Sequence, residues 1–260
     1  RGSGPASAGN CLGAIAHTRG WGVHMRITTQ GAAVALAMML TVHLAHAAKW
    51  ETQAIGDGAE GDAEFVDDEI TVTAVTGDIW DTADTLMYVY QETTGDMEIS
   101  ARVADYSPSN PDWGKAGLMI RQSVDADSAN AFINLTGNNG MKLIHRDTQA
   151  GATGPGDGGV DYDIPLYIRL TRVGDTITAF TSADGAAWVE AGGGLGPAAD
   201  IPMSGTIVAG MALSSNGADT AEIVFDEVDG TDGFARPVEP AGKLTTTWAD
   251  LRSHLAAPAP

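Results

Sequence analysis

The chain has 260 residues, which is enough for one large β domain or two small ones. Its 34 acidic and 14 basic residues give a formal net charge of −20, which argues against nucleic acid as a partner because phosphate binding needs a basic surface. Cys11 is the single cysteine, so neither a disulfide framework nor a thiolate metal site is expected. The 33 glycines and the hydrophobic fraction of 43% favour a turn-rich, all-β globular protein.

Residues 25–47 have the pattern of a secretory signal peptide. A positive charge near the start, an apolar run at 32–44 and a small-x-small site (AHA) predict cleavage after Ala47. The protein is therefore expected to be secreted, extracellular or on a bacterial cell surface. Residues 1–24 are interpreted as an upstream extension without a fold of its own. A membrane anchor is the alternative, but the apolar run is short for a spanning helix, and we expect no stable membrane span in the mature chain.

From residue 48 onward, short β-rich runs alternate with turn clusters at the spacing typical of a β-sandwich. Two-residue turns at 174–175 (GD) and 184–185 (DG) predict an antiparallel meander. We therefore expect an all-β, antiparallel jelly-roll β-sandwich over residues 48–235. The main expected strands are 70–75, 86–91, 97–105, 115–122, 131–135, 141–146, 166–173, 176–182, 206–213 and 221–228.

Two segments beside these strands carry further expectations. Residues 147–165 are rich in Gly and Asp and are interpreted as a mobile surface loop of the kind that rims binding sites. Residues 236–260 begin as a Pro-rich linker and continue into a short amphipathic helical tail, with Thr247 as its N-cap and Trp248 and Leu251 on one stripe. Two alternatives stay open for this tail, which docks either on its own domain or on another molecule.

The stretch 112–123 (DWGKAGLMIRQS) alternates with the period of a strand. Ala116, Leu118 and Ile120 predict a face that packs in the core. The other face carries mostly polar or bulky side chains: Trp113, Lys115, Gly117, Met119 and Arg121. It is either a binding surface or the solvent side of a sheet, on which cations pair with carboxylates such as Glu98 across strands.

Several motifs in one order resemble a known family. The strand GDMEISARV at 95–103, the strand WGKAGLMIR at 113–121 and the hairpin that starts RLTRVG at 169–174 resemble secreted bacterial domains with a concanavalin-A-like, lectin/glucanase-type β-sandwich. These are domains of unknown function related to the "regulation of enolase" proteins. The resemblance covers about residues 50–230, and it implies a jelly-roll fold and a carbohydrate-binding or adhesive role.

Applying the same alternation to the neighbouring strands predicts a ligand-binding face. An indole ring stacks on the apolar face of a sugar, while amides, ammonium groups and guanidinium groups bond its hydroxyls or carboxylates. Seven of the mature chain's basic residues lie between positions 102 and 172, which concentrates positive charge in these strands. The candidate ligand-binding residues are Trp113, Lys115, Arg121, Asn134, Lys142, Arg146 and Arg169.

Calcium is the one cofactor that the sequence raises, because turn carboxylates offer it hard oxygen ligands. The candidate ligands are Asp57, Asp62, Asp226 and Asp229, and none of their segments matches an EF-hand loop. Otherwise no cofactor is expected.

An enzyme is the less favoured interpretation. Glu60, Asp62 and Glu64 reproduce the E-x-D-x-E spacing that retaining laminarinase-type hydrolases use in this broad fold, as nucleophile, helper and acid/base. The residues between them are Gly61 and Ala63 rather than bulky core residues, and such a spacing arises easily in a chain with 34 acids. There is no G-x-S-x-G elbow for a serine triad.

The sequence thus favours a secreted, non-catalytic, lectin-like module that recognises a polysaccharide or cell-surface glycan through one face of the sandwich. The first alternative is a structural or adhesive surface protein that self-associates or docks through residues 236–260. A laminarinase-type glycoside hydrolase is the third.

Overall fold

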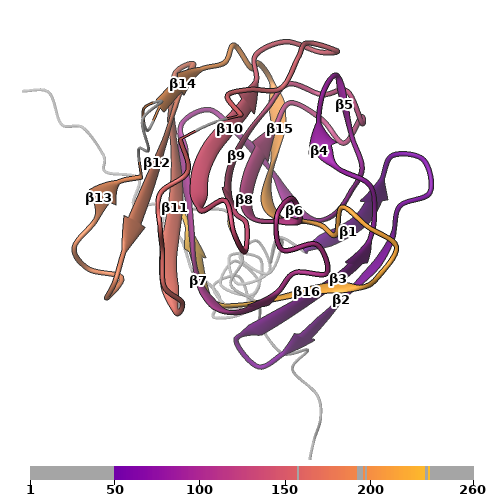
Figure 1. Ribbon diagram of the computed structural model, residues 1–260. Helices are drawn as coiled ribbons and strands as arrows, with labels where there is room; N and C mark the ends of the chain where they lie inside the picture. Colours follow the sequence, from indigo (N-terminus) through magenta and orange to yellow (C-terminus); the bar gives the residue numbers. More distant parts are fainter. Residues whose placement is uncertain (1–49, 157, 192–195, 197, 232–233, 235–260) are drawn as a thin grey trace, which may run out of the picture. The chain divides into compact units, whose positions relative to one another are not determined.

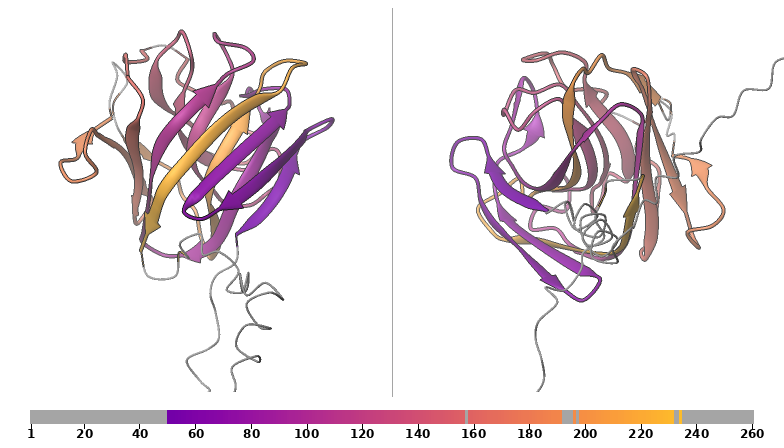
Figure 2. Two further views of the ribbon diagram at one scale, coloured as in Figure 1. Left: turned by 90° about the horizontal axis from the view of Figure 1, so that it is seen from below. Right: turned by 180° about the vertical axis from the view of Figure 1, so that it is seen from behind.

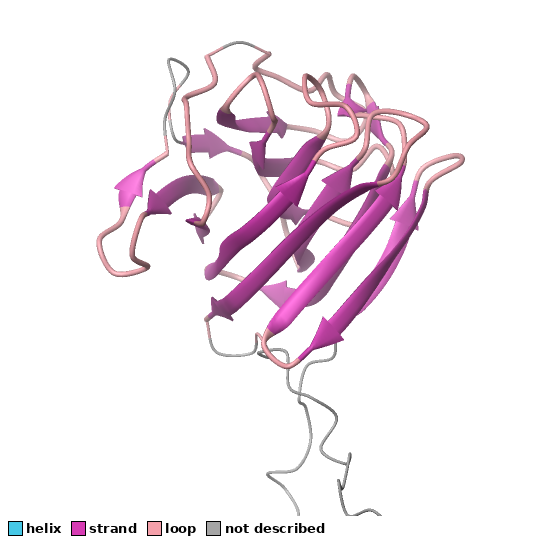
Figure 3. Ribbon diagram, turned by 60° about the horizontal axis from the view of Figure 1, so that its bottom comes forward, coloured by secondary structure: helices cyan, strands magenta, loops and turns pink. Residues whose placement is uncertain are grey.

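The computed structural model describes residues 50–156, 158–191, 196, 198–231 and 234, which belong to one compact unit of the chain, His46–Pro260. The predicted upstream extension, signal peptide and helical tail with its Pro-rich linker lie outside the described residues. The described residues form strands joined by loops, with no helix among them (Figure 3). None of the described residues forms a helix long and apolar enough to span a bilayer.

Two antiparallel sheets make up the fold, as the sequence predicts for a jelly-roll β-sandwich. In Figure 1 the eight-stranded sheet curves around the left and lower sides of the six-stranded sheet. The six-stranded sheet has the order β1 (Glu51–Ile55), β6 (Leu86–Thr94), β15 (Thr206–Ser214), β8 (Lys115–Arg121), β9 (Asn130–Leu135) and β10 (Met141–Arg146).

The eight-stranded sheet forms the second layer, and Figure 2 shows several of its strands side by side. Its order is β13 (Val189–Glu190), β12 (Thr176–Ser182), β11 (Leu166–Val173), β7 (Met97–Ser107), β16 (Ala221–Gly230), β3 (Glu69–Val75) and β2 (Glu60–Val66), with β14 (Ala198–Asp200) also paired to β12. A separate hairpin consists of β4 (Ile79–Trp80) and β5 (Ala83–Asp84).

The main core lies between the two sheets, where the alternation predicts it. Ala116, Leu118 and Ile120 of β8 are fully buried there, together with residues such as Ile99 of β7 and Phe225 of β16. Burying one such large aliphatic or aromatic side chain contributes about 1.5–3 kcal/mol. The predicted turn at Gly174 is also confirmed, because β11 and β12 pair up to Val173 and Thr176 on either side of it.

The outer face of the six-stranded sheet carries a second buried cluster, which the sequence did not predict. Tyr88, Met119, Phe132 and Ile144 lie on this face and are fully buried. The β4–β5 hairpin covers them and adds Ile79 to the cluster, as its position at the upper right of Figure 1 shows. Much of the face that the alternation left as a binding surface or a solvent side is therefore interior.

The long loop (147–165) runs back along β10, the edge strand of the six-stranded sheet. Backbone hydrogen bonds join it to the strand at two places, where Met141 exchanges bonds of 2.8 and 2.9 Å with Val160, and His145 exchanges bonds of 2.6 and 3.0 Å with Gly154. Covering an edge in this way occupies backbone groups that would otherwise be open to another strand. The loop therefore extends the six-stranded sheet at its β10 edge.

Candidate functional site

A cavity of about 410 Å³ opens on the outer face of the six-stranded sheet. We call it the tryptophan pocket. The β4–β5 hairpin, the turn before β8, the start of β10, the long loop and the segment after β15 all contribute to its walls. The tryptophan pocket is lined by Asp78, Trp80, Trp113, Lys115, Thr136, Lys142, Gly156 and Asn216.

Two indole rings with different surroundings face the tryptophan pocket. Trp113 is 51% exposed, and its turn is held by Asn110, whose Oδ1 accepts a 3.1 Å hydrogen bond from the Trp113 backbone N–H. Trp80 of β4 is half-buried, and a Cβ at Gly156 would stand 3.4 Å from its ring. Glycine at this position lets the long loop pass closely over the ring. One tryptophan is therefore open to a ligand and the other forms a fixed wall.

The two lysines of the tryptophan pocket come from different strands. Lys115 begins β8, and its Nζ forms an ion pair with Asp78 and donates a 3.2 Å hydrogen bond to the Trp113 carbonyl oxygen. The same Nζ lies 5.8 Å from the centre of the Trp80 ring, within reach of a cation–π interaction. Lys142 on β10 donates a 2.5 Å hydrogen bond to the carbonyl oxygen of Gly156. Each ammonium group thus joins its strand to a neighbouring wall of the pocket.

Arg121 and Arg146 lie on the same face of the sheet but are not accessible to a ligand. Both side chains are 0% exposed, and both bond the equally buried carboxylate of Asp84. Arg121 Nη1 lies 2.6 Å from Asp84 Oδ2, and Arg146 donates to Oδ1 at 2.6 Å and to Oδ2 at 2.8 Å. We call this trio the arginine clasp. Its two arginines, which the sequence placed among the ligand-binding residues, are interior ion-pair partners in the structure.

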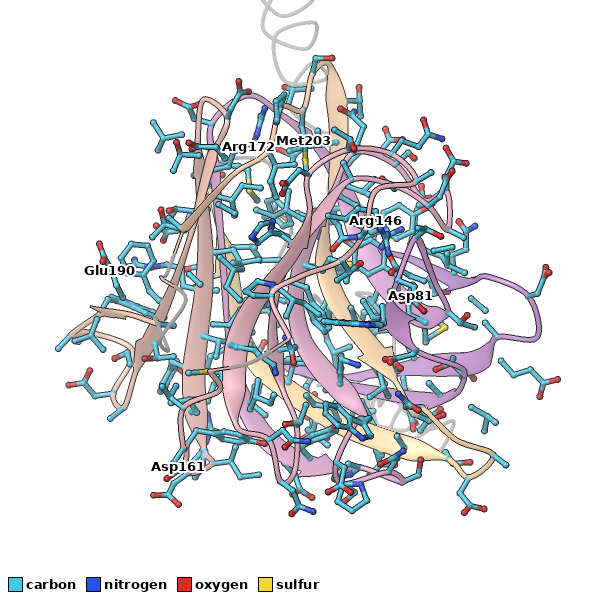
Figure 4. All side chains as sticks on the ribbon, turned by 45° about the horizontal axis from the view of Figure 1, so that its top comes forward. Asp81, Arg146, Asp161, Arg172, Glu190 and Met203 are labelled. Carbon is cyan, nitrogen blue, oxygen red and sulfur yellow. The ribbon has the colours of Figure 1, made fainter. Side chains whose placement is uncertain are left out.

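The arginine clasp holds the walls of the tryptophan pocket. Arg146 Nη2 donates 3.3 Å hydrogen bonds to the carbonyl oxygens of Trp80 and Asp81 in the β4–β5 hairpin, and Figure 4 shows Arg146 and Asp81 close together. Arg146 also bonds Thr153 Oγ1 at 2.8 Å and the Gly151 carbonyl oxygen at 3.0 Å, both in the long loop. Because the hairpin supplies Trp80 and the loop supplies Gly156, the clasp positions both sides of the pocket.

Two further predicted residues have other positions. Asn134 lies on the outer face opposite Gly117 and Lys142, but it is fully buried, donates a 3.1 Å hydrogen bond to the Lys142 carbonyl oxygen, and has no described partner for Oδ1. Arg169 lies on the other sheet, where Trp188 and Phe180 flank its guanidinium group at 4.1 and 4.9 Å. The predicted concentration of cations is therefore divided between the two sheets.

The acidic residues of β2 are remote from the tryptophan pocket. Glu60, Asp62 and Glu64 are exposed and share one side of this edge strand, as the alternation predicts. Gly61 and Ala63 point the other way, since Ala63 packs on the main core and a Cβ at Gly61 would meet the side chain of Met87. The three carboxylates thus lie on the outside of the eight-stranded sheet, whereas the pocket lies on the outside of the six-stranded sheet.

The calcium candidates do not form one cluster. The carboxylate of Asp226 is bonded by Arg102, whose Nε donates to Oδ1 at 2.8 Å. Asp57 lies in the turn between β1 and β2, Asp62 lies on β2, and Asp229 lies on β16. Across the residues that the structure describes, no group of three or more His, Cys, Asp or Glu side chains is placed to hold a metal ion.

Five residues of the tryptophan pocket were not among the predicted binding residues, although one of them, Gly156, lies in the loop predicted to rim a site: Asp78, Trp80, Thr136, Gly156 and Asn216. Sequence reasoning predicts core or edge packing for Trp80, as it does for Trp50 and Trp188. The DIWD sequence at 78–81 does carry a signal, an aromatic residue between acids just before a turn, but alternation within one strand cannot show which face a separate hairpin will cover.

Comparisons with known proteins agree with the fold. No protein family model and no curated protein match the sequence. A functionally unknown protein from Saccharomyces cerevisiae has a TM-score of 0.55 at 15% identity, over 70% of this chain and 95% of that chain. A protein of Bacillus licheniformis described as GH43 BlXynB has a TM-score of 0.44 at 20% identity, over 62% of this chain and 32% of that one. A Bauhinia forficata lectin in complex with GalNAc has a TM-score of 0.39 at 9% identity, over 71% and 100%.

The fold and the site together define a class, a jelly-roll β-sandwich with a tryptophan-lined pocket on the outer face of its six-stranded sheet. The yeast protein shares this fold, and the two antiparallel sheets packed around one core confirm the β-sandwich part of the predicted resemblance. The finer resemblance, to secreted domains related to the "regulation of enolase" proteins, stays a prediction.

Proposed function

We propose that the protein is a non-catalytic glycan-binding module and that the tryptophan pocket receives a sugar. The observation that carries the proposal is the position of two tryptophans around a cavity whose remaining lining is mostly polar. Trp113 offers an exposed ring on which the apolar face of a sugar can stack. Ammonium, carboxylate, hydroxyl and amide groups from the other lining residues are suited to hydroxyl recognition.

The dimensions and rigidity of the tryptophan pocket support this function. Its volume of about 410 Å³ lies within the range of small-ligand sites. The backbone of Trp113 is held by Asn110, which accepts a hydrogen bond from the Trp113 N–H and donates a 3.0 Å bond to the carbonyl oxygen of Asn216, another lining residue. Groups that are ordered before binding lose less conformational entropy when the ligand arrives.

The carboxylates of the chain support a binding role rather than hydrolysis. Glycosidases of the common type use two carboxyl groups on either side of the scissile bond. The described lining of the tryptophan pocket contains one carboxylate, Asp78, which is paired with Lys115. The E-x-D-x-E residues of β2 lie on the other sheet. We therefore propose that the bound glycan is released unchanged.

Replacing Trp113 by alanine is expected to weaken glycan binding about tenfold or more, because an exposed aromatic anchor of a binding site commonly contributes 1.4 kcal/mol or more. Stability should change little, since half of the side chain is already exposed. The measurement is calorimetric titration with the best-bound member of a panel of neutral and acidic oligosaccharides. Trp188→Ala on the eight-stranded sheet is the matched control and should retain full affinity. Equal losses in both variants, or no binding by the unmodified protein, would overturn the proposal.

Incubation with the same oligosaccharides is expected to release no new reducing ends above the buffer blank. The reason is that Asp78, the described carboxylate of the pocket, is held by an ion pair and has no second carboxyl group across from it in the described lining. Release that disappears in Asp78→Asn would identify a hydrolase at this pocket. Release that disappears in Glu60→Gln would identify one on β2.

We also propose an extracellular or cell-surface location, which rests on the signal peptide predicted at residues 25–47. When the chain is expressed in a bacterial host, the exported form should begin at Ala48, as read by intact mass. The adhesive alternative depends on residues 236–260, which lie outside the described residues.

A further inference from the structure

We propose that a second cavity beside the tryptophan pocket is a further sugar subsite, so that one chain of sugars occupies both cavities. This inference rests on the proposed glycan-binding function and names its ligand class, a neutral polysaccharide bound along its chain. The second cavity has a volume of about 460 Å³ and lies where the end of β7, the β9–β10 turn and the last residues of the long loop meet. We call it the tyrosine cavity, because Tyr106 and Tyr162 line it.

The β9–β10 turn (136–140) separates the two cavities. Thr136 lines the tryptophan pocket, whereas the next residue, Gly137, lines the tyrosine cavity. Neighbouring Cα atoms lie about 3.8 Å apart, so little more than the thickness of the backbone stands between the cavities. The long loop also lines both of them, with Gly156 at the first and Tyr162 at the second. A short chain of sugars can therefore reach from one cavity into the other.

The ridge between the cavities is exposed and held by hydrogen bonds. Asn138 Nδ2 donates a 2.7 Å bond to Asp112 Oδ1, and both residues are exposed. This bond joins the β9–β10 turn to the turn that carries Trp113. Tyr162 also fixes the β9–β10 turn, because its hydroxyl donates a 2.8 Å bond to the Thr136 carbonyl oxygen. The ridge is thus ordered before a ligand arrives, which lowers the conformational entropy lost when one ligand spans both cavities.

The tyrosine cavity offers groups that suit a sugar. Tyr162 is half-buried and presents part of an aromatic ring. Tyr106 is 9% exposed, and its buried hydroxyl has no described hydrogen-bond partner, which is unusual for a buried polar group. Asp161 and Asp163 are exposed at the rim, as Figure 4 shows for Asp161, and have no described partner. Their oxygens are therefore free to accept hydrogen bonds from sugar hydroxyls.

The charges of the tyrosine cavity disfavour an acidic sugar. Its described lining contains two carboxylates, Asp161 and Asp163, and no lysine, arginine or histidine. A carboxylate on the ligand would meet like charges there without a cation to balance them. We therefore expect the sugar unit bound in the tyrosine cavity to be neutral.

Oligosaccharides of increasing length test the inference on the full chain. The probes are neutral, β-linked oligomers of glucose, xylose and mannose, from disaccharide to hexasaccharide, titrated by calorimetry. In each series that binds, the hexasaccharide is expected to bind about a hundredfold more tightly than the disaccharide, because contact with the second subsite becomes intramolecular. One site alone would gain only a few-fold, from the larger number of positions at which a longer chain can bind. Oligomers of galacturonate should gain less, because their carboxylates meet those of the tyrosine cavity.

Asp161→Ala combined with Asp163→Ala is expected to reduce the hexasaccharide-to-disaccharide affinity ratio to below about tenfold, because the second subsite loses its charged acceptors. Both side chains are exposed, so the fold should be kept. Glu60→Ala combined with Glu64→Ala removes the same charge from exposed positions of β2 and is the matched control, which should keep the ratio. Tyr162→Ala removes the ring and should also reduce the ratio. Should it fail to fold, as judged by circular dichroism, the aspartate pair decides.

The outcomes separate the two proposals. A gain below about tenfold in every neutral series that binds would overturn this inference and leave the glycan-binding function intact. A gain that survives both the aspartate pair and Tyr162→Ala, or that is lost equally in the β2 control, would also overturn it. So would galacturonate oligomers that gain as much as the neutral ones or that alone bind. Failure of every series at every length would overturn both proposals together.

Discussion

Replacement of Asp84 by alanine is expected to lower the free energy of unfolding by about 3–5 kcal/mol, because it leaves two buried guanidinium groups without their carboxylate. Arg121, Arg146 and Asp84 are all 0% exposed. The carbonyl oxygens that also accept bonds from the arginines carry partial charge only, so they cannot replace an anion. Urea unfolding followed by intrinsic fluorescence measures the change.

A second acidic residue supplies the control for Asp84→Ala. Asp226 pairs with Arg102 on the eight-stranded sheet, but their side chains are 19% and 28% exposed. Water and salt weaken such a pair, so Asp226→Ala should cost about 1 kcal/mol or less. Asp84→Asn keeps the shape of the side chain and part of its hydrogen bonding. Its loss in free energy of unfolding should therefore lie between those of Asp84→Ala and Asp226→Ala. Similar losses for Asp84→Ala and Asp226→Ala would contradict a buried clasp.

The arginine clasp also links stability to function. Asp84→Ala frees Arg146 from its fixed position, and Arg146 is what bonds the hairpin carrying Trp80 and the loop carrying Gly156. The variant should therefore bind sugar more weakly even at a temperature where it remains folded. Unchanged affinity in folded Asp84→Ala would mean that the pocket walls are held by other contacts.

Gly117→Ala is expected to destabilise the fold by about 2–4 kcal/mol, as overpacking against backbone and a strained φ combine. The backbone φ of Gly117 is +154°, and an added Cβ would stand 2.1 Å from the carbonyl oxygen of Ile133 on β9. Backbone in the middle of a sheet cannot move aside as the tip of a flexible side chain does. The measurement is again urea unfolding.

Gly58→Ala is the control for Gly117→Ala, because it measures the cost of an unfavourable backbone φ without a steric clash. Gly58 has φ of +72°, but nothing lies within 4 Å of a Cβ added there. Its replacement should therefore lower the free energy of unfolding by about 1 kcal/mol, which is the cost of the positive φ alone. If Gly58→Ala and Gly117→Ala cost the same, the close approach of β8 and β9 is not what selects glycine at position 117.

Local patterns in the sequence predicted most of the fold. The period-two pattern of 115–122 placed Ala116, Leu118 and Ile120 in the core, and all three are fully buried. The Gly-Asp turn at 174–175 predicted a hairpin that the register of β11 and β12 confirms. These features follow from the sequence because side-chain alternation and turn conformation depend on residues that are close together in the chain.

The candidate site could be predicted only in part. Trp113, Lys115 and Lys142 were among the predicted binding residues and do line one cavity, whereas Arg121 and Arg146 share their face but are buried, and Arg169 lies on the other sheet. Alternation assigns a side chain to a face of its own strand and carries no information about what covers that face.

The sequence by itself therefore determined the all-β class, the main strands and the faces that pack between the sheets, while the tertiary structure decided which outward-facing residues are accessible. Asp84 meets Arg146 across 62 positions of sequence, and Trp80 meets the long loop at Gly156. Such contacts form only after the sheets pair and the hairpin folds over them, because they join segments whose separation along the chain leaves no local pattern.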